Sequence, residues 1–168
     1  MERTGRLIVM RHAKAGELPG GPDFERALRP RGRTDSSAAG QWLRARGYVP
    51  EVVLCSAARR ARQTWQYVAE ALVAEAPVGP MPAVRNEERL YQADADDLAQ
   101  ILRASPAGTG TLMYVGHNPA AADLVAMLTG SEPDFPTAAI AVIAVTGDWA
   151  SLSAGQHELL DSWTPARG

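Results

Sequence analysis

The stretch Leu7-Ile8-Val9-Met10-Arg11-His12 joins a short apolar run directly to two side chains that can carry chemistry. Two later segments have the same form, with Val52-Val53-Leu54-Cys55 running into Ser56 and Leu112-Met113-Tyr114-Val115 running into Gly116-His117. Apolar runs this short, without alternation, are typical of strands that are covered on both faces of a parallel sheet. The three runs therefore predict an α/β protein.

Stretches with helical periodicity lie between and after these runs. They cover Arg33 to Arg46, Arg59 to Glu75, Asp96 to Arg103 and Ala120 to Leu128, with Gly47 and Gly130 as the glycines that end the first and the last. Two further strands are expected, over Ala139 to Val145 and Gln156 to Leu160. The alternation predicts a three-layer α/β/α sandwich with a mainly parallel sheet flanked by helices. Between Ala69 and Leu112 we expect one short helix and loops, which leaves no room for a large lid insertion.

Length and composition limit the class of protein further. The chain has 168 residues, 46% of them hydrophobic and 21% charged, which predicts a single domain over residues 1–168. A net charge of −2 gives no reason to expect nucleic acid or a membrane as a partner. No apolar run approaches the roughly 20 residues that span a bilayer. The start, Met1 to Arg6, lacks a secretory signal, and the single Cys55 cannot form an internal disulfide, so we expect a cytoplasmic protein.

The residues that follow the three apolar runs should meet at one edge of the sheet, because ligands of open α/β sheets bind beyond the carboxyl ends of the strands. Arg11 and His12 follow the first run, Ser56 to Thr64 with three arginines follows the second, and His117 follows the third. Arginine forks match phosphate oxygens, and helix N-termini add N–H donors. Two arginines and a cationic histidine would suit a dianionic phosphoryl group.

Other kinds of site fit these residues less well. A divalent metal is disfavoured because the guanidinium groups repel it and its usual carboxylate ligands are missing from these motifs. The sequence contains no nucleotide-binding P-loop, and Ser56 has no evident catalytic triad. Cys55 ends an apolar run, so we expect a buried, inert thiol there. A neutral histidine can itself attack phosphorus, and nearby cations keep it neutral by lowering its pKa. A backbone carbonyl bound to one ring nitrogen would leave the other free to face the phosphorus.

The segment Leu7 to His12 resembles the signature of the histidine phosphatase (phosphoglycerate mutase-like) superfamily, in which Arg-His-Gly follows the first strand. Here Ala13 stands in the place of the glycine. The sequence is most similar to the short SixA-type phosphohistidine phosphatases, several of which carry Arg-His-Ala-Lys. Three other segments fit this group: Arg26 to Gly32, Ser56 to Thr64 and Phe135 to Ala139. The resemblance covers nearly the whole chain and implies the phosphoglycerate mutase-like fold.

The resemblance also implies roles for single residues. His12 matches the nucleophile that becomes phosphohistidine, Arg11 the arginine that binds the phosphoryl group, and His117 the second histidine of the pocket. The spacing from the serine to Gln-Thr places the second phosphate-binding arginine at Arg60, with Arg59 as its main rival. The family's acid usually follows the next strand, which makes Glu88 the preferred candidate over Glu87 or no acid. No metal or cofactor is implied.

We therefore expect a metal-independent phosphatase that forms a covalent phosphohistidine at His12. Its partner is expected to be a phosphorylated protein, carrying phosphohistidine as for SixA, or a small phosphorylated substrate. The alternatives are a small-molecule phosphomonoesterase of the same superfamily and a weakly catalytic phosphate-binding module, for which Ala13 leaves room. A mutase is disfavoured because it would need a substantial lid.

Overall fold

The computed structural model describes residues 4–74 and 79–166. Six strands form one sheet in the order β3-β2-β4-β1-β5-β6. Their bounds are β1 Thr4–Arg11, β2 Val52–Ser56, β3 Ala83–Glu87, β4 Thr111–Gly116, β5 Ile140–Thr146 and β6 Glu158–Trp163. β5 is antiparallel to both of its neighbours, and every other pair is parallel.

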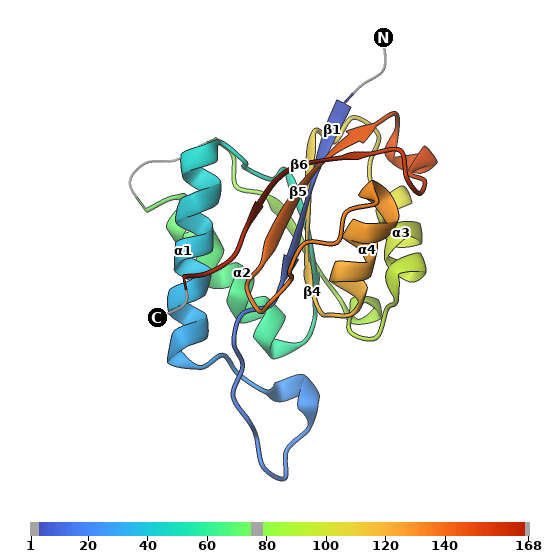
Figure 1. Cartoon of the computed structure of the whole chain (residues 1–168). Coiled ribbons are helices and arrows are strands. Elements are labelled where there is room, and N and C mark those ends of the chain that lie inside the picture. The colour runs from blue at the N-terminus through green and yellow to red at the C-terminus, as the bar shows by residue number, and fades with distance from the viewer. Residues whose placement is uncertain (1–3, 75–78, 167–168) are drawn as a thin grey trace.

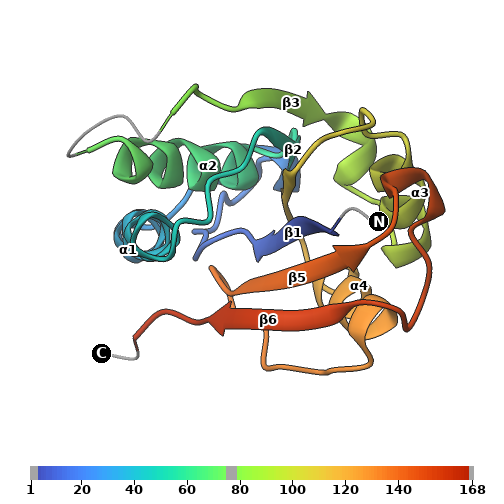
Figure 2. The same ribbon diagram turned by 90° about the horizontal axis from the view of Figure 1, so that it is seen from above.

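Four α-helices cover the two faces of this sheet. They are α1 Pro30–Arg46, α2 Arg59–Leu72, α3 Ala95–Arg103 and α4 Ala120–Thr129. α1 and α2 lie on one face, and α3 and α4 lie on the other (Figure 1, Figure 2). The predicted three-layer sandwich is therefore confirmed. α1 starts three residues before the predicted position, since the fixed φ of Pro30 suits the first turn of a helix. α2 ends at Leu72, and Glu75, where that helix was predicted to end, lies outside the described residues.

β1 divides its side chains between two hydrophobic cores. Leu7 and Val9 pack into the core on the side of α3 and α4, whereas Ile8 and Met10 pack into the core on the side of α1 and α2. All four side chains are fully buried. A strand with both faces covered needs apolar residues at every position, which explains the unbroken run in the sequence.

β3 corrects the prediction that the segment between Ala69 and Leu112 holds only one short helix and loops. This strand, Ala83–Glu87, pairs with β2 alone and forms an edge of the sheet. Its first four residues are exposed, so it carries neither a continuous apolar run nor a buried stripe. The sequence pattern that revealed the central strands is therefore missing here.

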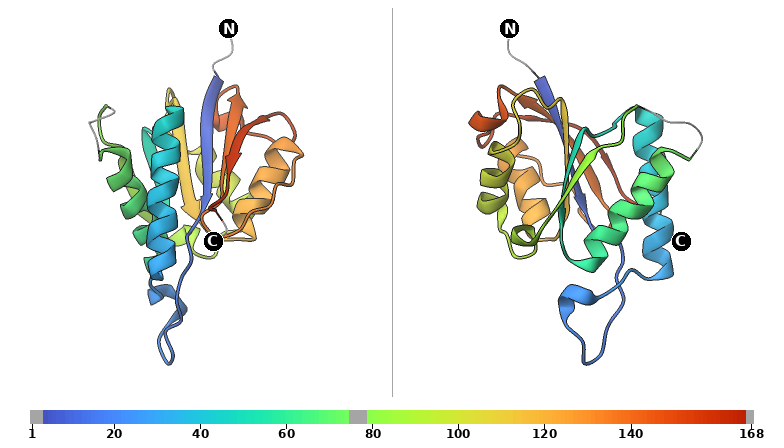
Figure 3. Two further views of the ribbon diagram at one scale, coloured as in Figure 1. Left: turned by 60° about the vertical axis from the view of Figure 1, so that its left-hand side comes forward. Right: turned by 180° about the vertical axis from the view of Figure 1, so that it is seen from behind.

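The topology brings the carboxyl ends of β1, β2 and β4 to one edge of the sheet. β1 and β4 are parallel neighbours in register, with Arg11 opposite Gly116, and β2 pairs with the other side of β4. The connection from β1 to α1 extends beyond this edge as a long loop (Figure 1, Figure 3). Among the described residues, no helix has the length and apolar character required to cross a membrane.

Candidate active site

His12 is the first residue after β1, and its backbone and ring are both fixed. Its N–H donates to the carbonyl of Gly116 on β4, at 2.8 Å. Its ring Nδ1 lies 2.8 Å from the carbonyl oxygen of Ala13. A carbonyl can only accept, so Nδ1 carries the proton and Nε2 of the neutral ring keeps its lone pair.

The segment after His12 is tied to α2. The N–H of Ala13 donates to the hydroxyl of Thr64 at 3.0 Å, and that hydroxyl donates to the carbonyl of Arg60 at 2.7 Å. One residue earlier on α2, the side-chain oxygen of Gln63 accepts from the N–H of Leu28 at 2.8 Å. The Gln-Thr pair of the sequence motif therefore holds both ends of the loop that surrounds the site. Ala13 is fully buried in this arrangement.

His12 lines a hollow of about 490 Å³ at the carboxyl edge of the sheet. The other residues that line it come from the ends of β1 and β4, from α2 and from three loops: Arg11, Lys14, Ala15, Asp23, Arg26, Arg60, Tyr91, Gln92, His117, Asn118 and Thr137. Four of the lining residues are lysine or arginine, and one is a carboxylate. A dianion is the ligand that such a hollow favours.

The structure brings four of the predicted site residues together. Arg11 donates from one terminal nitrogen to the carbonyl of Phe135 at 3.2 Å, and its Nε is buried without a partner among the described residues. Arg60 is buried, with its Nε also unpartnered, whereas Arg59 is exposed and does not line the hollow. The rings of His12 and His117 lie 5.2 Å apart between their centres.

His117 is oriented by two neighbouring side chains. Its backbone N–H donates to the hydroxyl of Tyr114 at 3.0 Å, and its ring Nε2 lies 2.8 Å from the hydroxyl of Ser56 at the end of β2. Its Nδ1 is buried and has no partner among the described residues. The contact between Ser56 and His117 joins two strand ends, and neither apolar run predicts it.

Comparison with known proteins identifies this arrangement. Residues 7–91 match the model of the histidine phosphatase superfamily, branch 1. The chain belongs to this superfamily. An uncharacterized protein of Mycobacterium leprae is 37% identical to the chain, over 93% of the chain and 99% of that protein.

Two solved structures show the same fold in histidine phosphatases. A protein of Nakamurella multipartitia assigned as phosphohistidine phosphatase SixA has a TM-score of 0.82 and 31% identity, covering 98% of each chain. The protein histidine phosphatase SixA in complex with tungstate has a TM-score of 0.76 and 26% identity, covering 95% of this chain and 97% of that one. Together with the superfamily match, these neighbours support phosphatase activity for this chain.

The electrostatics of the phosphatase site keep both histidines neutral. Burial lowers the pKa of His12 to about 3, and the positive charges of Arg60 and Arg11 act in the same direction. Burial and the charge of Arg60 lower the pKa of His117 to about 4. Burial and the nearby guanidinium groups disfavour a further positive charge on either ring. A neutral His12 is the form that can attack phosphorus.

Asp23 is a site residue that the sequence analysis missed. It lies in the loop after β1, in a short 3₁₀ turn over Asp23–Glu25, and its carboxylate accepts from Arg60 at 2.9 Å, from Arg26 at 2.9 Å and from the hydroxyl of Tyr91. The Tyr91 hydrogen bond, followed by the two arginines, holds the pKa of this carboxyl well below its usual range. The side chain of Asp23 is therefore an anion. No motif of fixed spacing marks it in the sequence.

Glu88, the acid predicted by resemblance, lies elsewhere. It begins a short 3₁₀ turn over Glu88–Leu90 and lines a neighbouring hollow with Phe24, Arg89 and Asp97, but it does not line the hollow at His12. The rival acid Glu87 pairs with Arg89 at 3.4 Å. Within the described part of the chain, Asp23 is the one carboxylate that lines the hollow with His12.

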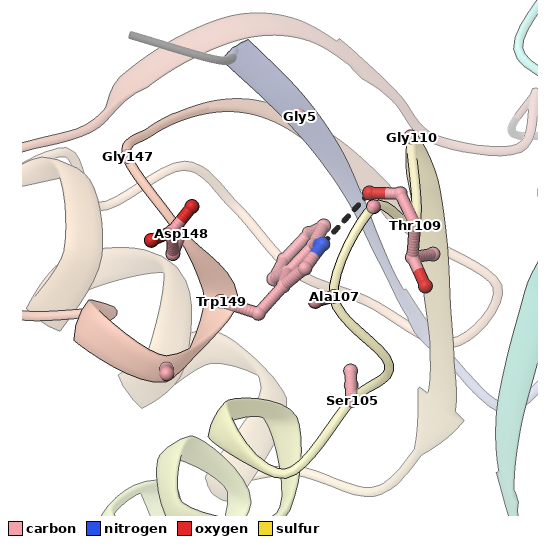
Figure 4. A pocket seen from close by; sticks show the side chains of 10 residues that line it. Gly5, Ser105, Ala107, Thr109, Gly110, Gly147, Asp148 and Trp149 are labelled. Atoms are coloured by element: carbon pink, nitrogen blue, oxygen red, sulfur yellow. Dashed lines mark hydrogen bonds between the residues drawn. The ribbon is translucent and has the colours of Figure 1, made fainter.

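Two other buried side chains, Cys55 and His157, lie outside the site. Cys55 is buried and unpaired, and burial raises its pKa to about 12, as expected for an inert thiol. His157 is buried and accepts from the N–H of Thr146 at 3.2 Å. A hollow of about 260 Å³ lies beside Trp149, whose indole N–H donates to the carbonyl of Thr109 (Figure 4). None of the predicted site residues lines that hollow.

Proposed function

We propose that this phosphatase transfers a phosphoryl group to His12 and then to water, and that phosphohistidine on a protein is its preferred substrate. The observation that carries the proposal is the hydrogen bond from Nδ1 of His12 to the carbonyl of Ala13. It leaves the lone pair of Nε2 available in a hollow lined by cations. The likeness to SixA supports the choice of substrate.

In the first step, the lone pair of His12 Nε2 forms a bond to phosphorus, and the bond from phosphorus to the leaving group breaks. The leaving nitrogen or oxygen takes the electron pair of that bond. Arg11 and Arg60 would bind the oxygens of the phosphoryl group and stabilise their charge in the transition state. His117 can donate one hydrogen bond to the same group from its neutral ring.

In the second step, water attacks the phosphorus of the phosphohistidine. The bond between phosphorus and Nε2 breaks, and its electron pair returns to the ring, which is neutral again with its proton on Nδ1. The protons of the attacking water stay on the phosphate or pass to the solvent. Inorganic phosphate is released. Both steps balance with the residues of the site and water, so the proposed reaction requires neither a metal nor a cofactor.

Asp23 bears on which leaving group the site favours. Its carboxylate is held as an anion by Tyr91, Arg60 and Arg26, so it is a poor proton donor. An anion beside the leaving group favours protonation of the bound phosphohistidine ring, which then leaves as neutral imidazole when the P–N bond breaks. The same anion opposes the departure of an alkoxide, which is negative. Phosphohistidine should therefore be cleaved in preference to alkyl phosphates, which agrees with the preference implied by SixA.

The experiment compares phosphohistidine protein with alkyl phosphates, by kcat/KM, in wild type and three variants. His12→Ala should abolish turnover of every substrate without loss of the fold, as followed by circular dichroism. Asp23→Asn should lower kcat/KM for phosphohistidine more than Glu88→Gln does. Full activity of His12→Ala would overturn the mechanism. The substrate preference would be overturned if kcat/KM for alkyl phosphates exceeded that for phosphohistidine protein by tenfold or more. A large loss of that activity in Glu88→Gln would restore Glu88 as the acid.

A further inference from the structure

A second hollow of about 410 Å³ adjoins the one at His12. It lies where the loop after β1 meets the start of α1, and it is lined by Lys14, Arg29, Arg31, Asp35, Pro136, Thr137, Thr164 and Pro165. Lys14 and Thr137 line both hollows. A substrate that places its phosphoryl group on His12 can therefore extend past Lys14 into this second hollow, which we call the Arg29 hollow.

The charges of the Arg29 hollow are only partly compensated. Arg31 pairs with Asp35 at 3.4 Å and donates to the carbonyl of Ala166 at 2.8 Å. Lys14 and Arg29 form no ion pair with any described residue, and both are exposed. Two positive charges thus face a concave surface without a counter-ion, next to a site that already attracts a dianion.

Backbone hydrogen bonds fix the main chain at these two residues. The N–H of Arg29 donates to the carbonyl of Lys14 at 2.9 Å, and the next pair along, Ala15 and Leu28, forms an antiparallel bridge. Gly32 packs against the same carbonyl so closely that a Cβ there would lie 2.2 Å from the oxygen. The segment from Arg26 to Gly32, which the phosphoryl chemistry does not explain, therefore anchors Lys14 and Arg29 beside His12.

We infer that the Arg29 hollow is a subsite for a carboxylate, supplied by an Asp or Glu side chain that lies near the phosphohistidine of a protein substrate. The inference rests on the proposed function for the identity of the phosphoryl donor. Lys14 offers a point charge and Arg29 a planar fork of donors, which together suit a carboxylate. An apolar side chain of the substrate would partly desolvate both cations without pairing with either of them. A basic side chain would be repelled by them.

The first test uses phosphohistidine peptides that differ only in the residues beside the phosphohistidine, which are either acidic or neutral. Wild type should hydrolyse the acidic peptide with a kcat/KM about twofold to fivefold higher, the range of an exposed ion pair. Arg29→Gln should lower this ratio towards one, because Lys14 alone remains, and Arg29→Glu should invert it. Arg85→Gln is the matched control, because Arg85 is an exposed arginine on β3 at the far edge of the sheet. Equal ratios in wild type and Arg29→Gln would overturn the subsite.

The second test does not depend on phosphohistidine. Alkyl phosphonates with and without a terminal carboxylate compete against hydrolysis of phenyl phosphate, over a series of chain lengths. The carboxylate should tighten inhibition of wild type at the chain length that reaches from His12 past Lys14, and Arg29→Gln should reduce that gain. Phenyl phosphate turnover should be unchanged in Arg29→Gln, since Arg29 does not line the hollow at His12. If the carboxylate does not tighten inhibition at any chain length, the subsite is refuted. If it tightens inhibition but neither phosphohistidine peptide is hydrolysed, only the proposed substrate is refuted.

Discussion

Replacing Ser56 with alanine tests how the second histidine of the site is held. The Ser56 hydroxyl is fully buried and already accepts from the N–H of Ala58 at 3.3 Å. Its own hydrogen is then free to donate to Nε2 of His117, 2.8 Å away. When the hydroxyl donates, the ring proton of neutral His117 lies on Nδ1, the nitrogen that has no partner among the described residues. We expect that N–H to donate to a phosphoryl oxygen when substrate is bound.

The magnitude follows from the hydrogen bond that is lost. Ser56→Ala leaves Nε2 as a buried acceptor without a partner, which costs about 1–3 kcal/mol of stability. The ring also becomes free to take the other tautomer, in which Nδ1 can no longer donate. If the same 1–3 kcal/mol is lost from the transition state, kcat/KM falls about fivefold to 150-fold.

The assay is a double-mutant cycle on kcat/KM with phosphohistidine protein, using Ser56→Ala, His117→Gln and the double variant. If Ser56 acts through His117, its replacement should have little further effect once His117 is gone. Urea unfolding of the same variants separates loss of stability from loss of activity. Additive losses in the double variant, or unchanged activity in Ser56→Ala, would refute the proposed role of the hydroxyl.

Three further predictions concern pH, packing and reactivity. The pKa of His12 is about 3 in the folded protein, and a histidine in the unfolded chain has a pKa of about 6.5. As pH falls from 6.5 towards 4, only the unfolded chain takes up a proton at this residue, so the free energy of unfolding decreases. At pH 5 this costs about 2 kcal/mol, and urea unfolding of His12→Gln should show a shallower pH dependence. Gly32→Ala should lower stability by about 1–3 kcal/mol and also reduce activity, because a Cβ would displace the carbonyl of Lys14; equal stability by urea unfolding would contradict this. Cys55, whose pKa is about 12, should react with an aromatic disulfide reagent only after unfolding, so prompt labelling of the native protein would count against the described core.

The sequence predicted the parts of the site that depend on strands buried on both faces. β1, β2 and β4 need unbroken apolar runs because helices cover both sides, and those runs mark where each strand stops. His12 and His117 come directly after the ends of β1 and β4, so finding the strands also located these two side chains.

The features that the sequence did not predict, β3 and the position of Asp23, lie in exposed segments. β3 is an exposed edge strand, and the pattern of its residues could equally belong to a loop. Asp23 reaches the site from a long loop, and its position results from contacts with Arg60 and Tyr91 that lie 37 and 68 residues away along the chain. Carboxylates in exposed loops are common, and only these distant partners distinguish Asp23 from them. For the same reason, Glu88 looked like a candidate in the sequence although its side chain lines another hollow, and its role as the acid stays a prediction.

The pairing of Asp23 with Arg60 also bears on how the proposed reaction could turn over. A buried guanidinium without a counter-ion is costly, and Asp23 supplies that counter-ion to Arg60. A phosphoryl dianion must compete with this carboxylate for Arg60, so substrate and inorganic phosphate both bind less tightly than the number of cations suggests. Weaker binding of the product speeds its release, and the substrate recovers part of the lost affinity only if it has further contacts. A carboxylate in the Arg29 hollow is such a contact, because it belongs to the substrate protein and leaves with it, whereas inorganic phosphate does not carry it.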